Sequence, residues 1–430
     1  MAWTTQLKSL TEDHVRLVQA FTLCRQTGII LGSIVVARVL PLNEVGILEL
    51  LVLCGYLMTF FWSDAFIKGY LAKKGELEIS TSTFLLFCFL LGLLSMSLLF
   101  VARHVLVPLF TDQDNLPGLA LFGLYQAIVV PLWLAPYMGG LTKHNIILAS
   151  VFVLVGPSFA TWVGHSSLAG INGILIGLLS YALVGFIWIL TQVKWKGDLH
   201  FLKLLNSLWP ITWPLILYAV SSAIAKSLDA WLVAHYFTET EFAVFRYGAR
   251  EFPLVVALAG SVSTIMIPKL LENKALPELK MRSARLMNRC YPLVAVLMLF
   301  SPPLFAFVFG EEFRSSAFIF NIYLLLTLTQ LIFPQTLMTA RGDTKILWFI
   351  SLLELGVNVS ASLFLMTQFG LIGIVWGTLV AFTFEKIILL ILVYKRYRIP
   401  PSDIFDTRML FAYTLLFIIT FILSSWFFGI

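Results

Sequence analysis

The chain contains 430 residues, of which 59% are hydrophobic and only 12% are charged, and its mean hydropathy is +0.92. Because soluble domains carry about 25% charged residues, this composition excludes a soluble globular protein and indicates a chain that crosses a bilayer repeatedly. The net charge of +6 is typical of a membrane protein whose cytoplasmic loops collect Lys and Arg. We therefore expect a lipid bilayer around the chain and no nucleic-acid partner.

The apolar segments predict an all-α membrane protein. Each segment is close to the ~20 residues that an α-helix needs to cross the hydrocarbon core. Prolines inside several segments fit this prediction, because membrane helices tolerate them as kinks. The thirteen segments cover residues 17–39, 45–67, 83–108, 118–138, 146–164, 168–193, 208–234, 242–267, 290–309, 316–339, 346–368, 370–394 and 409–429.

The charges between these segments predict their orientation. If the N-terminus is cytoplasmic, 21 of the 29 basic residues fall in inner connections. The outer turns are acidic instead, as at Glu44, Asp112 and Glu239. Because short cytoplasmic loops are enriched in Lys and Arg, we expect a multi-pass protein with a cytoplasmic N-terminus. The first fifteen residues have no apolar core, so we expect no cleavable signal peptide.

The chain also repeats short patterns between its two halves. Three matches lie at offsets of 197, 202 and 203 residues, each at the equivalent boundary of a predicted helix. Because six is an even number, two six-helix halves related in this way run parallel, as in transporters that move one half against the other. The matches pair residues 36–46 with 233–243, 140–143 with 342–345, and 168–171 with 371–374.

This repeat predicts two bundles and one extra helix. We assign residues 1–193 to an N-terminal six-helix bundle, 194–207 to a cytoplasmic linker, 208–394 to a C-terminal six-helix bundle, and 395–430 to a linker with an extra transmembrane helix. The predicted fold class is therefore all-α, with two parallel-repeat six-helix transmembrane bundles and a thirteenth, C-terminal helix outside the repeat. A duplication kept only for packing is the alternative, and the placement of the charges argues against it.

Ionisable residues inside the predicted helices are concentrated in four of them. Each such residue costs at least about 2.5–3.5 kcal/mol at the bilayer centre, so it usually faces a cavity or a partner. The four helices, 17–39, 45–67, 208–234 and 242–267, are the first two of each half. They carry Arg25, Glu49, Asp64, Lys68, Lys226, Asp229, Arg246, Arg250 and Glu251, whereas Glu354, Glu385 and Lys386 are exceptions in later helices.

The basic members of this set predict a cationic cavity. Arg246 and Arg250 are four residues apart and would share one helical face. Together with Arg25 and Lys226, they are the predicted substrate-binding residues. Arginine keeps its charge when buried, and its planar guanidinium binds phosphate oxygens in pairs. We therefore expect an anionic, phosphorylated cargo.

The remaining charges are predicted to serve ion coupling or to form internal ion pairs. A carboxylate that loses a basic neighbour becomes easier to protonate, so Asp229 or Glu251 would suit coupling to Na⁺ or H⁺. A static set of ion pairs, such as Glu49 with Arg246, stays open as the alternative. The sequence contains no CxxC or HExxH pattern, and we expect no metal and no cofactor. The residues in this group are Glu49, Asp64, Lys68, Asp229 and Glu251.

Several short motifs add a family resemblance. They are Arg-Val-Leu-Pro-Leu-Asn-Glu-Val-Gly at 38–46, the single Asp229 near a helix end, Phe-Gly-Glu-Glu-Phe-Arg-Ser-Ser-Ala at 309–317, Ala-Arg-Gly-Asp-Thr-Lys at 340–345, and Asn358 ahead of Phe-Gly-Leu-Ile-Gly-Ile at 369–374. Together these motifs resemble the Wzx-type O-antigen flippases, in the polysaccharide branch of the multidrug/oligosaccharidyl-lipid/polysaccharide superfamily, whose fold is MATE-like. The thirteenth helix departs from the twelve or fourteen that are common in that family.

The resemblance implies a function as well as a fold. In that family two bundles enclose a central, often cationic cavity and move undecaprenyl-pyrophosphate-linked glycans across the bacterial inner membrane. We therefore expect a monomeric transporter, and no enzyme, that flips a polyprenyl-pyrophosphate-linked oligosaccharide by alternating access. Polysaccharide-assembly proteins are its expected further partners.

Three other functions compete with this expectation. A MATE-type cation-coupled multidrug antiporter shares the fold, but it would favour an acidic, aromatic cavity for cationic drugs. A membrane-embedded glycosyltransferase or polymerase would need outer loops longer than the turns of about ten residues found here. A purely structural membrane protein would leave the clustered charges unexplained.

Overall fold

The computed structural model describes residues 2–73, 81–101, 103–106, 108, 116–138, 141–193, 201–267, 269–271 and 275–428. No residue in these ranges lies in a β-strand. The same ranges contain nine helices that are long and apolar enough to cross a bilayer, or ten if one bent pair of helices counts as a single span. The prediction of an all-α membrane protein is therefore confirmed, whereas the count of six, six and one helices stays a prediction.

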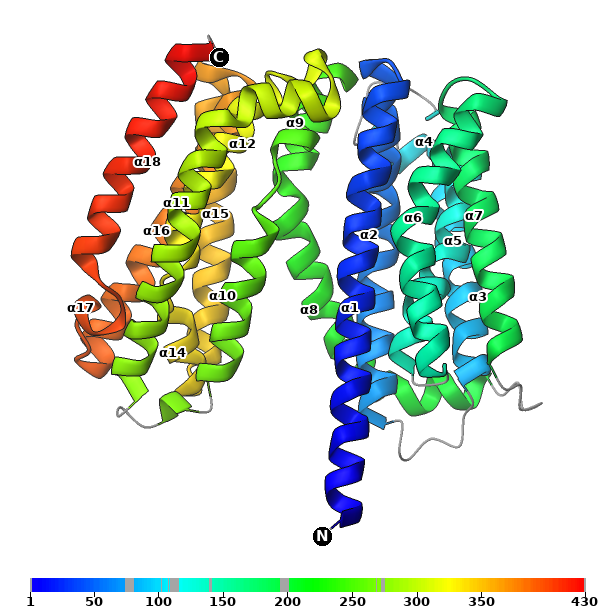
Figure 1. Cartoon of the computed structure of the whole chain (residues 1–430), viewed down its shortest axis with the longest axis horizontal. Coiled ribbons are helices and arrows are strands. Elements are labelled where there is room, and N and C mark those ends of the chain that lie inside the picture. The colour runs from blue at the N-terminus through cyan, green and yellow to red at the C-terminus, as the bar shows by residue number, and fades with distance from the viewer. Residues whose placement is uncertain are drawn as a thin grey trace. The chain divides into compact units, whose positions relative to one another are not determined.

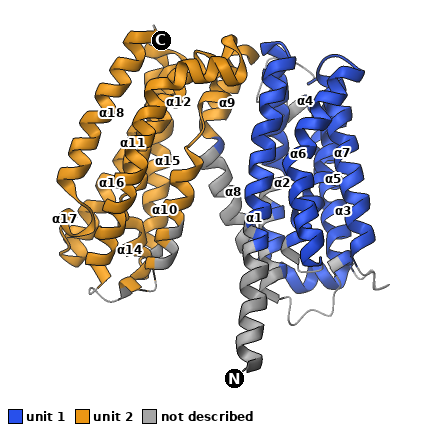
Figure 2. Cartoon of the chain, viewed as in Figure 1, with its two compact units in different colours: residues 1–227 blue, residues 228–430 orange. Residues whose placement is uncertain are grey.

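The chain forms two compact units, residues 1–227 and residues 228–430 (Figure 2). The boundary falls inside one long helix, α8 (Phe201–Tyr236). The predicted linker 194–207 overlaps the start of this helix, and its residues 194–200 lie outside the described part of the chain. The predicted bundle boundaries therefore stay a prediction.

Unit 1 is built from α6, which packs against α1 and α7, and from α5, which packs against α3 and α7 (Figure 1). The contact of α1 with α6 depends on Gly28, because a Cβ atom there would lie 2.0 Å from the carbonyl oxygen of Val153. The helices of this unit are α1 (Ala2–Val39), α2 (Leu42–Lys73), α3 (Thr81–Val101), α4 (Arg103–Leu106), α5 (Leu119–Leu134), the 3₁₀ turn η2 (Ala135–Met138), α6 (Lys143–Ser167) and α7 (Ile171–Gln192).

Glu44 connects the start of α2 with the start of α7. Its Oε2 atom accepts a hydrogen bond of 2.9 Å from the backbone N–H of Ile171. The residue before the helix, Gly170, has φ = 85°, a left-handed conformation that glycine adopts without strain. A carboxylate at a helix N-terminus also pairs with the positive end of the helix dipole, so Glu44 has a local structural role.

Unit 2 contains more and shorter helices, arranged around α11 and the pair α15 and α16 (Figure 1). Its core includes Met287, Tyr291 and Met298 of α11. The elements are α9 (Glu239–Gly248), α10 (Pro253–Met266), η3 (Lys269–Leu271), α11 (Leu276–Phe309), η5 (Glu311–Phe313), α12 (Ser316–Leu325), α13 (Thr327–Gln330), α14 (Pro334–Ala340), α15 (Thr344–Phe369), α16 (Leu371–Tyr397), α17 (Pro401–Ile404) and α18 (Thr407–Phe428).

Two predicted helices of unit 2 are interrupted. The expected helix 242–267 is divided into α9 and α10, and the expected helix 316–339 is divided into α12, α13 and α14. Proline begins the new helix at Pro253 and at Pro334. Because proline lacks an N–H group and disfavours the helical conformation of the residue before it, these two prolines break the helix. The prediction of simple kinks is therefore wrong at these positions.

The second interruption is stabilised by side chains of α11. The hydroxyl of Ser283 donates 2.7 Å to the carbonyl of Leu331, and that of Tyr291 donates 3.3 Å to the carbonyl of Leu328. These bonds satisfy carbonyl groups that lose their helical partners at the break. The interruption is thus part of the packed structure of unit 2.

The C-terminal helix α18 packs on α11. The ring of Tyr291 contacts Tyr413 and Phe417, with ring centroids 5.1 Å and 5.4 Å away. Nearer the end of α18, Asn321 of α12 donates to Ser424 at 3.2 Å and accepts from Ser301 of α11 at 2.8 Å. The thirteenth predicted helix therefore belongs to the core of unit 2.

The helix boundaries change the alignment of the third sequence match, which paired residues 168–171 with 371–374 at an offset of 203. α7 begins at Ile171 and α16 begins at Leu371, each directly after a glycine in a left-handed conformation. The equivalent positions are therefore 200 residues apart, and Gly173 corresponds to Gly373. A Cβ atom on either glycine would clash with a backbone carbonyl of the preceding helix. Both helix pairs thus use glycine for the same close approach.

Candidate functional site

The interruption between α9 and α10 contains two of the predicted site residues. Arg246 lies in the last turn of α9, and Arg250 and Glu251 lie in the irregular segment that follows Gly248. The prediction that both arginines share one helical face is therefore wrong, because α9 ends at Gly248, before Arg250. The two arginines still meet, because Arg250 Nε donates 3.4 Å to the carbonyl of Arg246.

The end of α9 is held in place by contacts of Val244 and Tyr247, the residues close to Arg246 in the chain. The ring of Tyr247 lies 4.4 Å from that of Phe313, and the guanidinium of Arg250 lies 5.0 Å above the Tyr247 ring. Ser316 of α12 donates 2.8 Å to the carbonyl of Val244. Non-helical backbone at membrane depth persists only where protein or a water-filled space surrounds it, and interrupted helices form ion and substrate sites in many transporters. The segment 249–252 is therefore a candidate binding element.

Asp229 lies at the centre of a polar cluster inside unit 2. Its Oδ2 atom accepts from the hydroxyls of Tyr323 at 3.1 Å and Thr378 at 2.5 Å, and its Oδ1 atom accepts from the amide of Asn358 at 3.4 Å. Behind them, the hydroxyl of Ser362 donates 2.9 Å to the side-chain oxygen of Asn358. These four partners are buried and come from α12, α15 and α16, whereas Asp229 is half-buried on α8.

The cluster brings together mainly oxygen atoms. Both Ser362 and Thr378 also lie 3.3 Å from the carbonyl oxygen of Ile374. A carboxylate, hydroxyls, an amide oxygen and a carbonyl in one place can hold a proton or a small hard cation such as Na⁺. In the described ranges, no three His, Cys, Asp or Glu side chains gather as a site for a transition metal.

Sequence reasoning found only part of this cluster. It selected Asp229 for its charge, and Asn358 only as a family motif, and it missed Tyr323, Ser362 and Thr378. A usable signal was present, because Asn358 and Ser362 are four residues apart on one face of an apolar helix. Arg246 and Glu251 lie within electrostatic range of the Tyr323 hydroxyl. The structure therefore gathers Asp229, both arginines and Glu251 in one region of unit 2.

A second buried polar group joins α14 to α16. Lys386 Nζ lies 3.3 Å from a carboxylate oxygen of Glu385, and it donates 2.7 Å to the side-chain oxygen of Gln335. The amide nitrogen of Gln335 donates to the other oxygen of Glu385. Glu354 of α15 lies within electrostatic range of this pair and of Asp229. Removing one member of such a buried pair would leave an uncompensated charge, which is strongly destabilising.

The site residues predicted for unit 1 are described only in part. Arg25 of α1 is half-buried, and its guanidinium lies 5.3 Å above the ring of Trp133 of α5. Its Nε atom is buried and finds no hydrogen-bond acceptor in the described structure. Glu49 is half-buried on α2. The side chains of Asp64, Lys68 and Lys226 lie outside the described residues, so the cationic cavity stays a prediction.

One family motif has a structural explanation. Asp343, between α14 and α15, binds Arg396 at the end of α16 through two contacts of 2.7 Å and 2.8 Å, and it also accepts from the hydroxyl of Tyr397. Arg341 lies 5.4 Å above the Tyr397 ring. The motif at 340–345 therefore fixes one end of the α15–α16 pair.

Comparisons with known proteins agree with this architecture. The sequence matches the family described as polysaccharide biosynthesis protein over residues 35–318. No curated protein sequence matches the chain significantly.

Several solved structures have a similar fold. "Lipid II flippase MurJ, inward closed conformation" is similar with a TM-score of 0.60 and 16% identity, over 96% of this chain and 99% of that chain. The Vibrio cholerae MATE transporter VcmN in its bent form gives a TM-score of 0.53 and 16% identity, over 96% and 99% of the two chains. An outward-facing multidrug resistance MATE family transporter of the MOP superfamily gives 0.54 and 14%, over 91% and 96%.

These structural likenesses establish the fold, and the family match covers more than half of the chain. The helices, their composition and both comparisons agree. The chain is a multi-pass membrane protein with the MATE-like fold, and it belongs to the polysaccharide biosynthesis protein family.

Proposed function

We propose that this protein flips a polyprenyl-pyrophosphate-linked oligosaccharide across the bacterial inner membrane by alternating access, with its N-terminus in the cytoplasm. Membership of the polysaccharide biosynthesis family supports the glycan, and the fold shared with MurJ supports a lipid-linked cargo. The single observation that carries the proposal is Arg25, a half-buried cation above Trp133 whose Nε donor has no acceptor among the described residues. A buried donor without an acceptor costs about 1–3 kcal/mol, and an anionic ligand would remove that cost.

The pyrophosphate is the part of such a cargo that requires the protein. The polyprenyl tail can stay in hydrocarbon and the glycan can stay in water, but two phosphates in a low-dielectric space need compensating charge. Guanidinium groups bind phosphate oxygens with two parallel hydrogen bonds. Arg25, Arg246 and Arg250, together with Lys226, are the proposed recognition residues.

We further propose that the Asp229 cluster binds the coupling ion, Na⁺ or H⁺. Its oxygens come from helices α8, α12, α15 and α16, so an ion bound there would hold these four helices together. Glu251, within electrostatic range of Tyr323, is the second carboxylate proposed for coupling. Glu49, Asp64 and Lys68 remain proposed partners of the cationic residues.

The test is genetic and biochemical. In cells that depend on this protein for surface glycan, Arg25→Ala should abolish glycan display and accumulate the lipid-linked unit on the cytoplasmic side. Arg25→Lys, which keeps the charge but loses the paired hydrogen bonds, should reduce display only in part. Cys24→Ala, at the neighbouring half-buried position, is the control and should behave as wild type. Normal display by Arg25→Ala, at normal protein level, would refute anion recognition by Arg25.

A second candidate function, a MATE-type multidrug antiporter, is favoured by the carboxylate of Asp229 inside the helical bundle. The fold also matches MATE multidrug transporters, and a carboxylate inside a helical bundle suits cationic drugs. Efflux of ethidium by reconstituted protein, lost in Asp229→Asn and unaffected in Arg25→Ala, would favour a cation-coupled multidrug antiporter over the flippase.

A further inference from the structure

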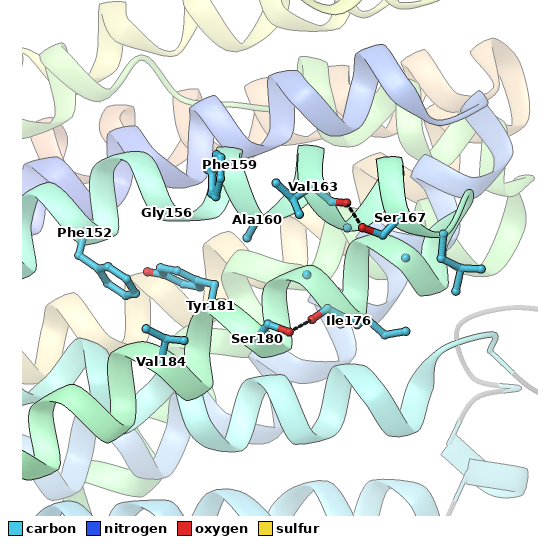
Figure 3. Close-up of a pocket in the computed structure, with 14 residues that line it drawn as sticks. Phe152, Gly156, Phe159, Ala160, Val163, Ser167, Ile176, Ser180, Tyr181 and Val184 are labelled. Carbon is cyan, nitrogen blue, oxygen red and sulfur yellow. Dashed lines mark hydrogen bonds between the residues drawn. The ribbon is translucent and has the colours of Figure 1, made fainter.

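An apolar groove runs along the surface of unit 1 between α6 and α7 (Figure 3). Its volume is about 370 Å³, within the ~300–1,000 Å³ of typical ligand pockets. Its walls are large side chains, with Phe159 and Val163 on α6 and Ile176 and Val184 on α7. Phe159 and Val184 are about 60% exposed (62% and 61%), so the groove is open along its side.

Small residues create the floor of this groove. A Cβ atom on Gly164 would lie 2.3 Å from the carbonyl oxygen of Gly173, and one on Gly177 would lie 2.1 Å from that of Ala160. The backbones of α6 and α7 therefore touch, as small residues allow in membrane helices. Because the floor has almost no side chains, the flanking large residues stand above it as two walls.

The two serine hydroxyls of the groove are already satisfied. The hydroxyl of Ser167 donates 2.8 Å to the carbonyl of Val163, and that of Ser180 donates 2.8 Å to the carbonyl of Ile176 (Figure 3). None of the described lining residues is charged. The groove therefore offers mainly dispersion contacts and burial of apolar surface. Its polar exception is the buried hydroxyl of Tyr181, which has no hydrogen-bond partner among the described residues.

We propose that this groove binds one acyl chain of a membrane glycerophospholipid. Both helices are apolar enough to span the bilayer, so lipid hydrocarbon is the expected surrounding of the groove. The groove begins at the turn between the two helices, where Leu168 lines it, and this turn lies at a membrane surface. From Gly173 to Val184 it follows α7 for about 17 Å at 1.5 Å per residue.

That length identifies the occupant. One leaflet contributes about half of the ~30 Å hydrocarbon core, so an acyl chain whose headgroup lies beside the α6–α7 turn fills the groove and ends near its far end. A polyprenyl chain is much longer and carries a pyrophosphate, and the groove lining provides no cation for that group. A phospholipid headgroup can stay in the interface instead. None of the proposed glycan-recognition residues is among the described residues that line this groove.

The experiment counts retained lipids by native mass spectrometry. Full-length protein is delipidated in detergent and incubated with palmitoyl-oleoyl phosphatidylethanolamine. Val163→Trp fills the groove from α6, and Ser180→Phe fills it from α7. Val155→Trp is the matched control, because Val155 is 55% exposed on the same helix and does not line the groove.

Wild type and Val155→Trp should retain one more phospholipid per chain than either groove-filled variant. Equal lipid counts in all four proteins would overturn the proposal, and so would a loss of equal size in Val155→Trp. If wild-type protein purified from the membrane retains a polyprenyl lipid and Val163→Trp does not, the assignment to a phospholipid would be overturned. Two filling variants on different helices keep the test decisive if one of them fails to fold.

Discussion

Replacing Thr378 by valine removes one hydroxyl from the Asp229 cluster and leaves its shape nearly unchanged. Thr378 is buried, and its Oγ1 atom lies 2.5 Å from Asp229 Oδ2. A hydrogen bond to a charged group contributes about 1.5–3 kcal/mol, and every 1.4 kcal/mol corresponds to a tenfold change in affinity. If the cluster holds Na⁺, with the Thr378 hydroxyl oxygen as one of its ligands, Thr378→Val should weaken Na⁺ binding by about 10- to 150-fold.

The assay is the thermal stability of purified protein titrated with NaCl against choline chloride at constant ionic strength and constant pH. An ion that binds only the folded protein raises its unfolding temperature as the ion concentration exceeds the dissociation constant. Wild type should be stabilised by Na⁺, and the midpoint of that titration should move to about 10- to 150-fold higher concentration in Thr378→Val.

The matched control is Thr161→Val in unit 1. Thr161 is also buried, but its hydroxyl bonds only the carbonyl of Pro157 one turn earlier in its own helix. This variant should lose a little stability and keep the wild-type midpoint. An unchanged midpoint in Thr378→Val, or an equal shift in Thr161→Val, would show that the Asp229 cluster is not the ion site.

Two further predictions concern stability. Gln335→Leu removes hydrogen bonds to both members of the buried Glu385–Lys386 pair and should lower the free energy of unfolding by about 3 kcal/mol or more. The exposed Gln368→Leu should leave it unchanged, and equal losses would contradict the role of Gln335. Gly28→Ala forces α1 away from α6 and should cost about 1–3 kcal/mol by overpacking. Gly356→Ala, where nothing lies within 4 Å of the new Cβ, should cost nothing, and chemical unfolding in detergent measures all four.

The fold class could be predicted from the sequence because a membrane-spanning helix is identified by the composition of a continuous run of residues. Runs of about 20 apolar residues identify spans regardless of packing, and the described helices follow those runs. Helix interruptions were less predictable, because a proline in a membrane helix either kinks or breaks it, depending on its neighbours. At Pro253 the neighbouring α9 is held by Tyr247 and Ser316, contacts that no local pattern reveals.

The candidate site was predictable only where a charge marked it. Asp229 stands out in an apolar sequence, but Tyr323 and Thr378 are ordinary residues of membrane helices until folding brings them to its carboxylate. Their distances in sequence from Asp229 are 94 and 149 residues. No spacing rule connects residues so far apart, since the connection is made by helix packing.

The interruption between α9 and α10 brings the basic Arg250 into the same region of unit 2 as the acidic Asp229. α2 of unit 1 runs without a break from Leu42 to Lys73, whereas its predicted counterpart stops at Gly248 and resumes at Pro253. The interruption places the Arg250 side chain against the end of α9, where it covers a carbonyl that has no helical partner. An anion that bound Arg250 would compete with that carbonyl for the guanidinium, and it would do so within electrostatic reach of the hydroxyl that binds Asp229. Cargo binding and ion binding would then act on the same few residues, and this physical link is what ion-coupled transport requires.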